Sequence, residues 1–229
     1  MIDFHTHILP GMDDGSRNTV ESVAMLSAEA QQGITNVILT PHYYASENSP
    51  LDFLKRRELA WKRLAAHLRP EFPKVHLGAE VQYFEGISSI QDVRHLKIED
   101  TDLLLLEMPF CRWTERMIDD VLDLNDRADM QIVLAHIDRY LPMQRSDVWA
   151  YLKSYGILTQ ANISFFADWK TKLRAMHMLS KNQIDFLGSD CHNMNRRAPH
   201  WDLVSPKALE MIRKSEEYDA LLDILGEDS

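Results

Sequence analysis

Short apolar runs alternate with amphipathic helical segments along the whole chain, and most of the runs end in a histidine or an acidic residue. The runs have the length of β-strands, and they comprise residues 1–4, 36–40, 75–78, 102–106, 131–135, 157–161 and 185–188. Strands that alternate with helices favour an α/β fold with a parallel sheet, which is either doubly wound or closed as a barrel.

The segments between the runs have helical periodicity and recognisable ends. Asn18 is followed three residues later by Glu21, which predicts a capped helix that stops at Gly33. The other predicted helices are residues 51–68, 114–128, 146–155 and 168–182, followed by a helical tail over residues 205–225.

The positions of the polar residues choose between the two architectures. Histidine, aspartate or glutamate follows the carboxyl ends of the first five strands and of the seventh: His5 and His7, His42, Glu80, Glu107, His136, and Asp190 and His192. In parallel barrels the active site lies at this end, and only a closed barrel brings six strand ends to one point. The sequence therefore predicts a barrel of seven βα units.

The first fifteen residues indicate what the converging side chains bind. Alternation in an extended segment places His5 and His7 on one side, and Asp13 and Asp14 add anionic oxygens just beyond them. Nitrogen and carboxylate ligands of this kind hold divalent cations. A His-x-His pair alone is also compatible with two exposed histidines, but the recurrence of the same residue types at later strand ends favours a metal site.

Length, charge and cysteine content restrict the class of protein. With 229 residues and 45% hydrophobic content, the chain can bury one substantial core, and we expect a single domain over residues 1–229. The formal net charge of −10 disfavours a general nucleic-acid binder. Cys111 and Cys191 are too few for a disulfide framework and indicate a reducing compartment. Without a leader peptide or an apolar run of membrane length, we expect a cytoplasmic protein with no membrane insertion.

Seven motifs resemble, in their order, those of the polymerase-and-histidinol-phosphatase (PHP) superfamily. They are His5-Thr6-His7, Gly11-Met12-Asp13-Asp14-Gly15, Thr40-Pro41-His42-Tyr43, Gly78-Ala79-Glu80, Glu107, residues 134–140 (LAHIDRY) and residues 188–193 (GSDCHN). Each motif is weak alone, but seven in one order are specific. Within the superfamily the chain is most similar to the manganese-dependent protein-tyrosine phosphatases encoded with bacterial capsule and exopolysaccharide genes.

The resemblance implies a distorted, seven-stranded parallel TIM-like barrel, the PHP fold, that holds three divalent metal ions. The implied ligands are His5, His7, Glu80 and Asp190 for the first ion, Glu80, Glu107 and His136 for the second, and Asp14, His42 and His192 for the third. The family suggests manganese, although donors of this kind also fit iron or zinc.

The resemblance also implies a phosphate site. Arg139 and Arg197 match the family's phosphate-binding arginines, whose forked donors meet two phosphoryl oxygens at once. Arg196 is the alternative to Arg197, and a loop ion pair with Asp138 is the alternative role of Arg139. The implied reaction is the hydrolysis of a phosphate monoester by a metal-activated hydroxide.

Less specific candidates complete the site. Asp13 is a candidate proton donor, and Tyr43 is a candidate for stacking on an aromatic substrate, with Tyr44 and Trp113 as further possibilities. Cys191 and Arg197 have the Cys-x5-Arg spacing of cysteine-dependent phosphatases. We reject that mechanism because the segment between them has no glycine and Cys191 lies between two expected metal ligands.

The implied function is a protein-tyrosine phosphatase that acts on the tyrosine-rich tail of a bacterial kinase controlling capsular or exopolysaccharide synthesis. A small-molecule phosphatase, such as a histidinol-phosphate phosphatase, is the alternative with the same metal site, and a non-catalytic metal-binding module is the third. A homo-oligomer is compatible with the helical tail, and we expect no nucleic-acid partner.

Overall fold

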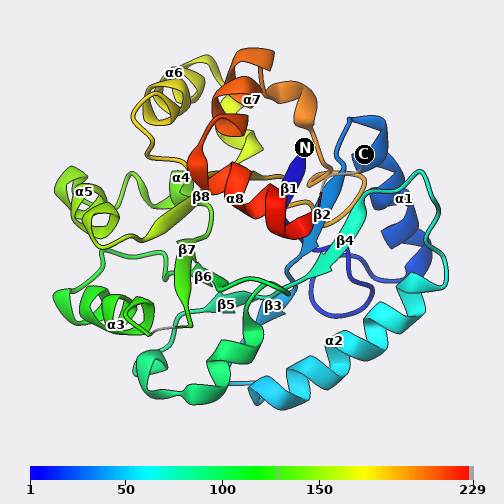
Figure 1. Cartoon of the computed structure of the whole chain (residues 1–229), viewed down its shortest axis with the longest axis horizontal. Coiled ribbons are helices and arrows are strands. Elements are labelled where there is room, and N and C mark those ends of the chain that lie inside the picture. Colours follow the sequence, from blue (N-terminus) through cyan, green and yellow to red (C-terminus); the bar gives the residue numbers. More distant parts are fainter. Residues whose placement is uncertain (128, 227–229) are drawn as a thin grey trace.

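The computed structural model describes residues 1–127 and 129–226, in which helices surround parallel strands (Figure 1). The strands form two sheets, with the orders β1-β2-β4 and β3-β5-β6-β7-β8-β9, and neighbouring strands pair in parallel. The predicted α/β fold with parallel strands is therefore confirmed. The strands are β1 (Ile2–Thr6), β2 (Asn36–Leu39), β3 (His42–Tyr43), β4 (Lys74–Leu77), β5 (Glu80–Gln82), β6 (Leu103–Glu107), β7 (Gln131–Leu134), β8 (Leu158–Asn162) and β9 (Phe186–Gly188).

The second and third predicted strands each continue past a bend as a separate short strand. β3 follows β2, and β5 follows β4, after two residues in each case. Backbone hydrogen bonds continue through the bends, because Gly78 N donates to Leu39 O (2.8 Å) and Glu80 N donates to Pro41 O (3.1 Å). The described residues thus contain nine strands in two sheets where the sequence predicted seven in one.

The first sheet also meets the second where β1 lies beside β9. Asp190 N donates to His5 O (2.8 Å) and His7 N donates to Cys191 O (2.9 Å), while Thr6 and Cys191 form a parallel bridge. The carboxyl ends of the first and last strands are therefore held together, although 183 residues separate His7 from Asp190 in the chain.

The predicted helices are present, mostly one to three residues shorter at their ends. The capping prediction is confirmed, because the Asn18 side chain accepts a hydrogen bond from Glu21 N (3.1 Å). The predicted end at residue 128 lies outside the described residues. The helices are α1 (Thr19–Gln31), α2 (Pro50–Ala65), α3 (Glu115–Asn125), α4 (Ile137–Tyr140), α5 (Ser146–Ser154), α6 (Trp169–Leu179), α7 (Pro206–Arg213) and α8 (Glu216–Leu225).

The predicted tail is two helices rather than one. α7 ends at Arg213, and the Ser215 hydroxyl caps α8 by accepting a hydrogen bond from Tyr218 N (3.2 Å). α8 returns to the start of the chain (Figure 1), where Ile2 N donates to the Tyr218 hydroxyl oxygen (2.9 Å). The tail is thus packed on the sheet.

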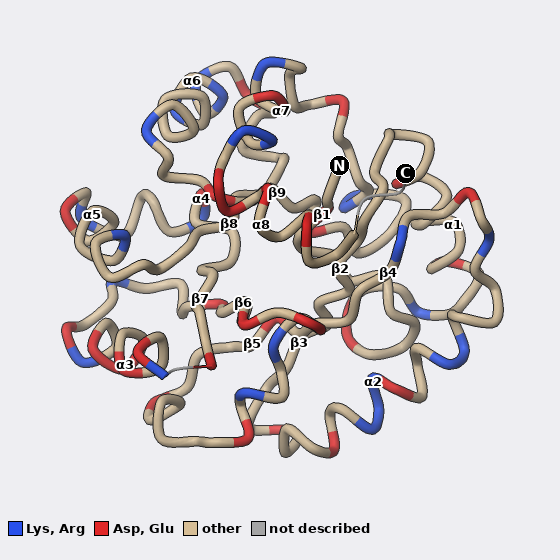
Figure 2. Tube along the Cα trace, in the orientation of Figure 1, with Lys and Arg blue, Asp and Glu red and all other residues tan. Residues whose placement is uncertain are grey.

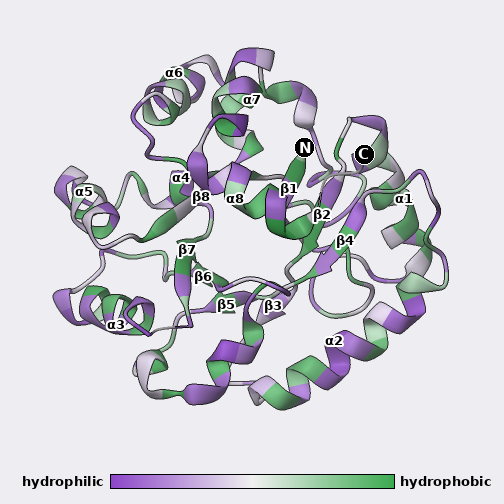
Figure 3. Cartoon of the chain, in the orientation of Figure 1, coloured by the Kyte–Doolittle hydropathy of each residue, from purple (hydrophilic) through white to green (hydrophobic). Residues whose placement is uncertain are grey.

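Hydrophobic residues alternate with hydrophilic residues along outer helices such as α2 (Figure 3). In the core, Phe4 of β1 stacks on Phe186 of β9 with 4.3 Å between the ring centroids. Lysine, arginine and the acidic residues are frequent on the outer helices such as α2 and α3 (Figure 2). Among the described residues, no helix combines the length and the apolar character needed to cross a membrane.

Candidate metal centre

All nine side chains predicted as metal ligands come together at the carboxyl ends of the strands. Seven of them are buried, although each is polar or ionisable. His42 is partly exposed (13%), and Asp14 reaches in from an exposed position (66%) on the loop after β1. The seven buried residues are His5, His7, Glu80, Glu107, His136, Asp190 and His192.

The first group consists of His5, His7 and Asp190, which offer ligand atoms within 4.8 Å of one another. The Nε2 atoms of the two histidines are 3.0 Å apart. They lie 3.8 Å and 3.5 Å from Asp190 Oδ1, and Glu80 Oε2 is 3.1 Å from His5 Nε2 and 3.2 Å from His7 Nε2. The four residues that the resemblance implied as ligands of the first ion therefore lie close together.

Glu80 lies at the middle of the cluster and extends it to the second group. Glu80 Oε1 is 3.0 Å from His136 Nε2, which is also 3.3 Å from Glu107 Oε1. Glu80 Oε2 is 3.0 Å from His42 Nδ1, and the compact group here is His42, Glu80 and Glu107. His42 therefore lies between the positions expected for two different ions.

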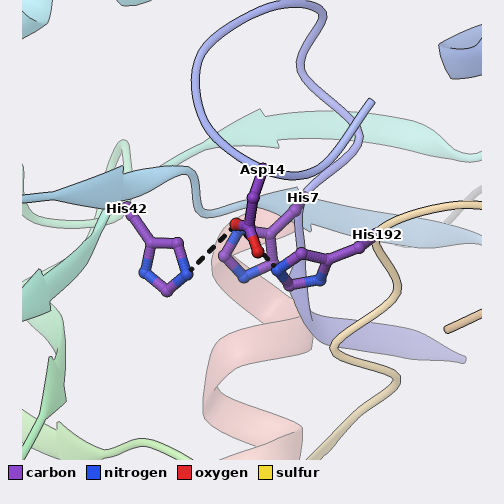
Figure 4. Close-up of side chains that lie close together, drawn as sticks. All are labelled: His7, Asp14, His42 and His192. Carbon is purple, nitrogen blue, oxygen red and sulfur yellow. Dashed lines mark ion pairs between the residues drawn. The ribbon is translucent and has the colours of Figure 1, made fainter. Parts of the chain in front are cut away.

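The third group is His7, Asp14, His42 and His192 (Figure 4). Asp14 Oδ1 is 3.3 Å from His192 Nε2 and 3.6 Å from His42 Nε2. The rings of His7 and His192 are in contact, with 3.8 Å between their centroids. His7 thus belongs to both the first and the third group, which the sequence did not predict.

Several ligand atoms in the cluster are buried without a hydrogen-bond partner among the described residues: His42 Nδ1, Glu80 Oε2, His136 Nδ1 and His192 Nε2. Glu80 Oε2 is close to three imidazole nitrogens, but not at hydrogen-bonding angles. Such atoms are costly to bury unless they bind something. Nitrogen and carboxylate donors that converge in this way fit divalent transition metals.

Hydrogen bonds from outside the cluster orient the first two histidines. His7 Nδ1 lies 2.7 Å from Asp13 Oδ2, and His5 Nδ1 lies 3.2 Å from Gln160 Oε1. With Nδ1 engaged, Nε2 of each ring faces the cluster. Carboxylate or amide partners of this kind fix the orientation of metal-binding histidines.

Sequence reasoning missed the contribution of β8, the one predicted strand without an assigned ligand. Gln160 accepts from both His5 Nδ1 and His136 N (2.7 Å) and donates to Asn162 Oδ1 (3.0 Å). Asn162 Nδ2 in turn donates to Asp190 Oδ2 (2.9 Å). The available signal was a glutamine and an asparagine at the end of an otherwise apolar run.

The backbone is unusual at two of the candidate ligands. His136 (φ 32°) and Asp190 (φ 54°) both have positive φ, a conformation that residues other than glycine seldom adopt. Both closely follow strands, β7 and β9. Strain of this kind persists where the surrounding structure enforces it, which is common at functional sites.

The charges in the cluster shift the pKa values of its members. Burial alone would lower the pKa of His7, but Asp13 and Glu80 raise it to about 10. Burial would raise the pKa of Glu80, but the surrounding histidines, with His5 first, hold it well below its usual range. Burial and the charge of His7 lower the pKa of His192 to about 3. The carboxylate of Glu80 therefore stays ionised and available to a cation.

Arg139 of α4 and Arg197 of the loop after β9 both reach the cluster at Asp190. Arg139 Nη2 donates to Asp190 Oδ2, and Arg197 Nη2 donates to Asp190 Oδ1 (2.6 Å). Both side chains are 36% exposed, so their guanidinium groups lie between the buried cluster and solvent. Asp138 instead accepts from Asn162 N (2.9 Å), and the alternative ion pair with Arg139 is not among the contacts of the described residues.

Comparison with known proteins assigns the chain to a family. The family model for capsular polysaccharide synthesis, CpsB/CapC, matches residues 1–228. The chain belongs to the CpsB/CapC family. The tyrosine-protein phosphatase YwqE of Bacillus subtilis is 30% identical over 212 residues, which cover 87% of this chain and 80% of YwqE. The tyrosine-protein phosphatase CpsB of Streptococcus pneumoniae is 27% identical over 227 residues, with 90% of each chain covered.

Solved structures agree with this membership. The chain is similar to one from a crystallographic study of YwqE from B. subtilis and CpsB from S. pneumoniae, described as unique metal-dependent tyrosine phosphatases. The TM-score is 0.77, at 25% identity, with 97% of this chain and 92% of the other covered. Histidinol phosphate phosphatase from Lactococcus lactis shares the fold, with a TM-score of 0.55 at 12% identity and coverage of 93% and 92%.

Asp13 is placed as an orienting carboxylate rather than as a proton donor. Its Oδ2 accepts from His42 N (2.9 Å) and contacts His7, and its Oδ1 accepts from Gly15 N (2.9 Å). Burial would raise the pKa of Asp13, but His7 lowers it to about 2. A group that ionises so readily holds no proton to donate near neutral pH, which argues against the predicted role.

Cys191 has none of the properties of a nucleophilic thiolate. It is fully buried, and its Sγ lies 3.6 Å from Glu29 Oε1. Burial, together with the charge of Glu29, raises the pKa of the thiol well above its usual range. A reactive cysteine needs the opposite, a lowered pKa and access to substrate, and this supports the rejection of the Cys-x5-Arg mechanism.

Of the three aromatic residues predicted to lie beside the cluster, Tyr43, Tyr44 and Trp113, only Tyr44 presents its ring there. Tyr43 is 2% exposed and donates to Asn48 O, and Trp113 is also buried, so neither ring is open to a substrate. Tyr44 instead stacks on His42 (5.2 Å between centroids), and Phe110, which is 54% exposed, stacks on His136 (5.7 Å). These two rings replace Tyr43 as candidates for contact with an aromatic substrate.

Proposed function

We propose that this chain is a metal-dependent protein-tyrosine phosphatase that acts in capsular or exopolysaccharide synthesis. The observation that carries the proposal is the convergence of nine potential metal ligands, eight in the three compact groups and His136 beside Glu80 and Glu107, next to two arginines that share Asp190. Membership of the CpsB/CapC family and the similarity to YwqE support it. We further propose that the substrate is the tyrosine-rich tail of a bacterial kinase.

The proposed ligand assignment has three ions. His5, His7, Glu80 and Asp190 would hold the first, Glu80, Glu107 and His136 the second, and Asp14, His42 and His192 the third. The three overlapping groups support this assignment, with His7 and His42 in positions to be shared. Manganese is the proposed metal, and the same donors fit iron or zinc.

Bound divalent cations would supply the Lewis acid that activates water and neutralises the phosphate. Side chains of the protein supply the other functions, which are binding the phosphate and orienting the ligands. We propose that Arg139 and Arg197 hold the phosphoryl oxygens, and the hydrogen bond from Nη2 of each to a carboxylate oxygen of Asp190 at the edge of the cluster supports this. Asp13 keeps His7 in the orientation in which Nε2 faces the cluster.

Two aromatic rings at the edge of the site favour an aryl phosphate over an alkyl phosphate. Phe110 and Tyr44 stack on His136 and His42, so each extends the wall of the site. A phosphotyrosine ring can pack between or against them in an offset or edge-to-face arrangement. A phenolate is also a good leaving group, so the reaction has little need for the proton donor that Asp13 does not provide.

We also propose that the whole chain acts as one PHP-type domain and that its two sheets form a distorted, seven-stranded barrel. This counts β2 with β3 and β4 with β5 as single bent strands. The hydrogen bonds between β1 and the segment after β9 support closure. A cytoplasmic location is proposed because both cysteines are free thiols, which suits a reducing compartment.

The test is phosphate release from a phosphotyrosine peptide and from histidinol phosphate by chelator-stripped protein before and after reloading with manganese. We expect turnover of the peptide only after reloading. Arg139→Ala and Arg197→Ala should each lower kcat by about 10²–10³-fold, whereas Arg174→Ala, an exposed arginine on α6, should not. Activity that survives chelation would refute the proposal, and a preference for histidinol phosphate would make the chain a small-molecule phosphatase.

A further inference from the structure

A groove of about 330 Å³ opens on the surface directly beside the candidate metal centre. The loop after β1 and the start of α1 form one wall, with Arg17 and Glu21. The loop after β9 forms the other, with Asn193 and Arg196. Asp14 lies at the end of the groove next to the cluster, where its Oδ1 is 3.3 Å from His192 Nε2 (Figure 4).

Because Asp14 lines the groove and also contacts the histidines of the cluster, the groove adjoins the site proposed for the phosphate. An extended chain advances by about 3.3 Å per residue. A side chain within a few residues of the phosphotyrosine is therefore the part of the substrate that reaches the groove.

The loop after β9 is held so that its two adjacent arginines face different places. Asn193 Oδ1 accepts from the backbone N–H groups of Asn195 (3.0 Å), Arg196 (3.0 Å) and Arg197 (3.3 Å). His192 N donates back to Arg197 O (2.9 Å). In this turn Arg197 points to Asp190, while Arg196 is exposed and lines the groove.

Two arginines line the groove, and they differ in whether a carboxylate pairs with them. Arg17 Nε donates to Glu21 Oε2 (3.1 Å), so these two side chains largely neutralise each other. Asp14 is directed at the histidines of the cluster. Arg196 makes no ion pair with any carboxylate in the part of the chain that the structure describes, and its charge is available to a ligand.

We propose that this groove is a subsite for an anionic side chain that lies close to the phosphotyrosine in the substrate polypeptide, with Arg196 as its main contact. The inference rests on the proposed phosphatase function and extends it to substrate selection. Arg197 then binds the phosphate that is hydrolysed, and Arg196 binds the neighbouring anionic side chain. The anion is either a carboxylate or a second phosphotyrosine, which share this chemistry.

The test is a set of phosphotyrosine peptides that carry glutamate, glutamine or a second phosphotyrosine at each of roughly three positions on either side of the reacting residue. For the wild-type protein loaded with manganese, we expect an anionic neighbour at one or two positions to lower KM by about twofold to fivefold relative to glutamine. In Arg196→Gln, the ratio of KM for the glutamine peptide to KM for the anionic peptide should be close to one. Arg174→Gln, a matched exposed arginine on α6, should keep the wild-type ratio.

A binding measurement separates recognition from turnover. In calorimetric titrations with a non-hydrolysable phosphonate analogue of each peptide, the effect of an anionic neighbour on binding affinity should also depend on Arg196. The anion whose gain in binding affinity depends more strongly on Arg196 is the one expected beside the phosphotyrosine in the natural substrate. An unchanged ratio in Arg196→Gln, or no preference in the wild type, would overturn the subsite while leaving peptide hydrolysis intact. Failure of the phosphatase proposal is a different result, namely no hydrolysis of any phosphotyrosine peptide.

Discussion

Two clusters of buried carboxylates lie close together in this protein, and their protonation differs. In the candidate metal centre, Glu80 and Asp190 face histidines and arginines, and their pKa values are held below the usual range despite burial. The second cluster is Asp3 and Glu29, which share the Trp201 indole N–H as donor (3.3 Å and 3.1 Å). Burial raises the pKa of both, and for Glu29 the charge of Asp3 raises it further.

The difference shows that burial alone does not make a metal site. Asp3 precedes His5 by two residues on the same strand, yet no cationic group faces it among its described hydrogen-bond partners. Asp3 and Glu29 therefore hold a proton between them and act as a structural hydrogen-bonded pair. The carboxylates of the metal centre remain charged because their neighbours are positive or can become so.

Glu80→Gln should have the largest effect, since it removes the carboxylate shared by the first two groups. We expect loss of bound metal, measured by elemental analysis, and a fall in kcat of about 10³-fold or more, because metals contribute several kcal/mol to the transition state. The matched variant Glu29→Gln, in the other cluster, should keep both. Equal damage by the two substitutions would mean that the clusters are not functionally distinct.

Asp13→Asn tests how far the orientation of His7 matters. The substitution keeps the size of the side chain but removes the charge that faces Nδ1 of His7. Loss of such a partner lowers metal affinity by about 10–100-fold, and competition with a fluorescent chelator would measure it. Asp223→Asn on the exposed side of α8 is the control. Unaltered affinity in Asp13→Asn would assign the carboxylate a purely structural role.

Gly188→Ala should displace His5 or Gln160 beside the metal centre. A Cβ at this position would lie 2.6 Å from His5 Cβ and 2.9 Å from Gln160 Nε2, so one of them must move. We expect unfolding to become easier by about 1–3 kcal/mol in denaturant titrations, together with weaker metal binding. Gly33→Ala, where the added Cβ meets no described atom within 4 Å, should lose stability through its backbone alone and retain its metal.

Glu29→Gln should change the pH dependence of stability, and of the four substitutions it should disturb the metal centre least. Above pH 4.5, the ordinary pKa of glutamate, the unfolded chain releases the proton that the folded protein keeps. The wild-type free energy of unfolding therefore falls as pH rises toward the raised pKa, by about 1.4 kcal/mol for each pH unit between the unfolded and folded pKa values. Relative to the wild type, Glu29→Gln should therefore gain stability as the pH rises above 4.5. Parallel stability curves would contradict a protonated Glu29.

The sequence predicted the strand ends well because local patterns determine them. The apolar run that became β7 ends at Leu134, and His136 follows it as expected. All nine predicted ligands converge for the same reason, since parallel strands deliver their carboxyl ends to one place.

Other features depend on contacts that no local pattern contains. Gln160 orients His5 across 155 residues of sequence, and the pKa of Asp13 depends on the histidines packed around it. Tyr43 and Tyr44 are adjacent and similar, and only the bend of the short β3 decides which ring is buried. The break at Ser215 was also missed, although the polar residues 213–217 interrupt the apolar pattern of the tail there.

The pairing of β1 with the segment after β9 has a consequence for how the protein is made. The ribosome releases His5 and His7 early, whereas Asp190 and His192 emerge only after the strands and helices between them have been synthesised. The hydrogen bond from Ile2 N to the Tyr218 hydroxyl on α8 forms later still. A nascent chain therefore lacks the complete set of candidate ligands until residue 192 has been synthesised, so the first strand cannot complete the metal centre while it folds.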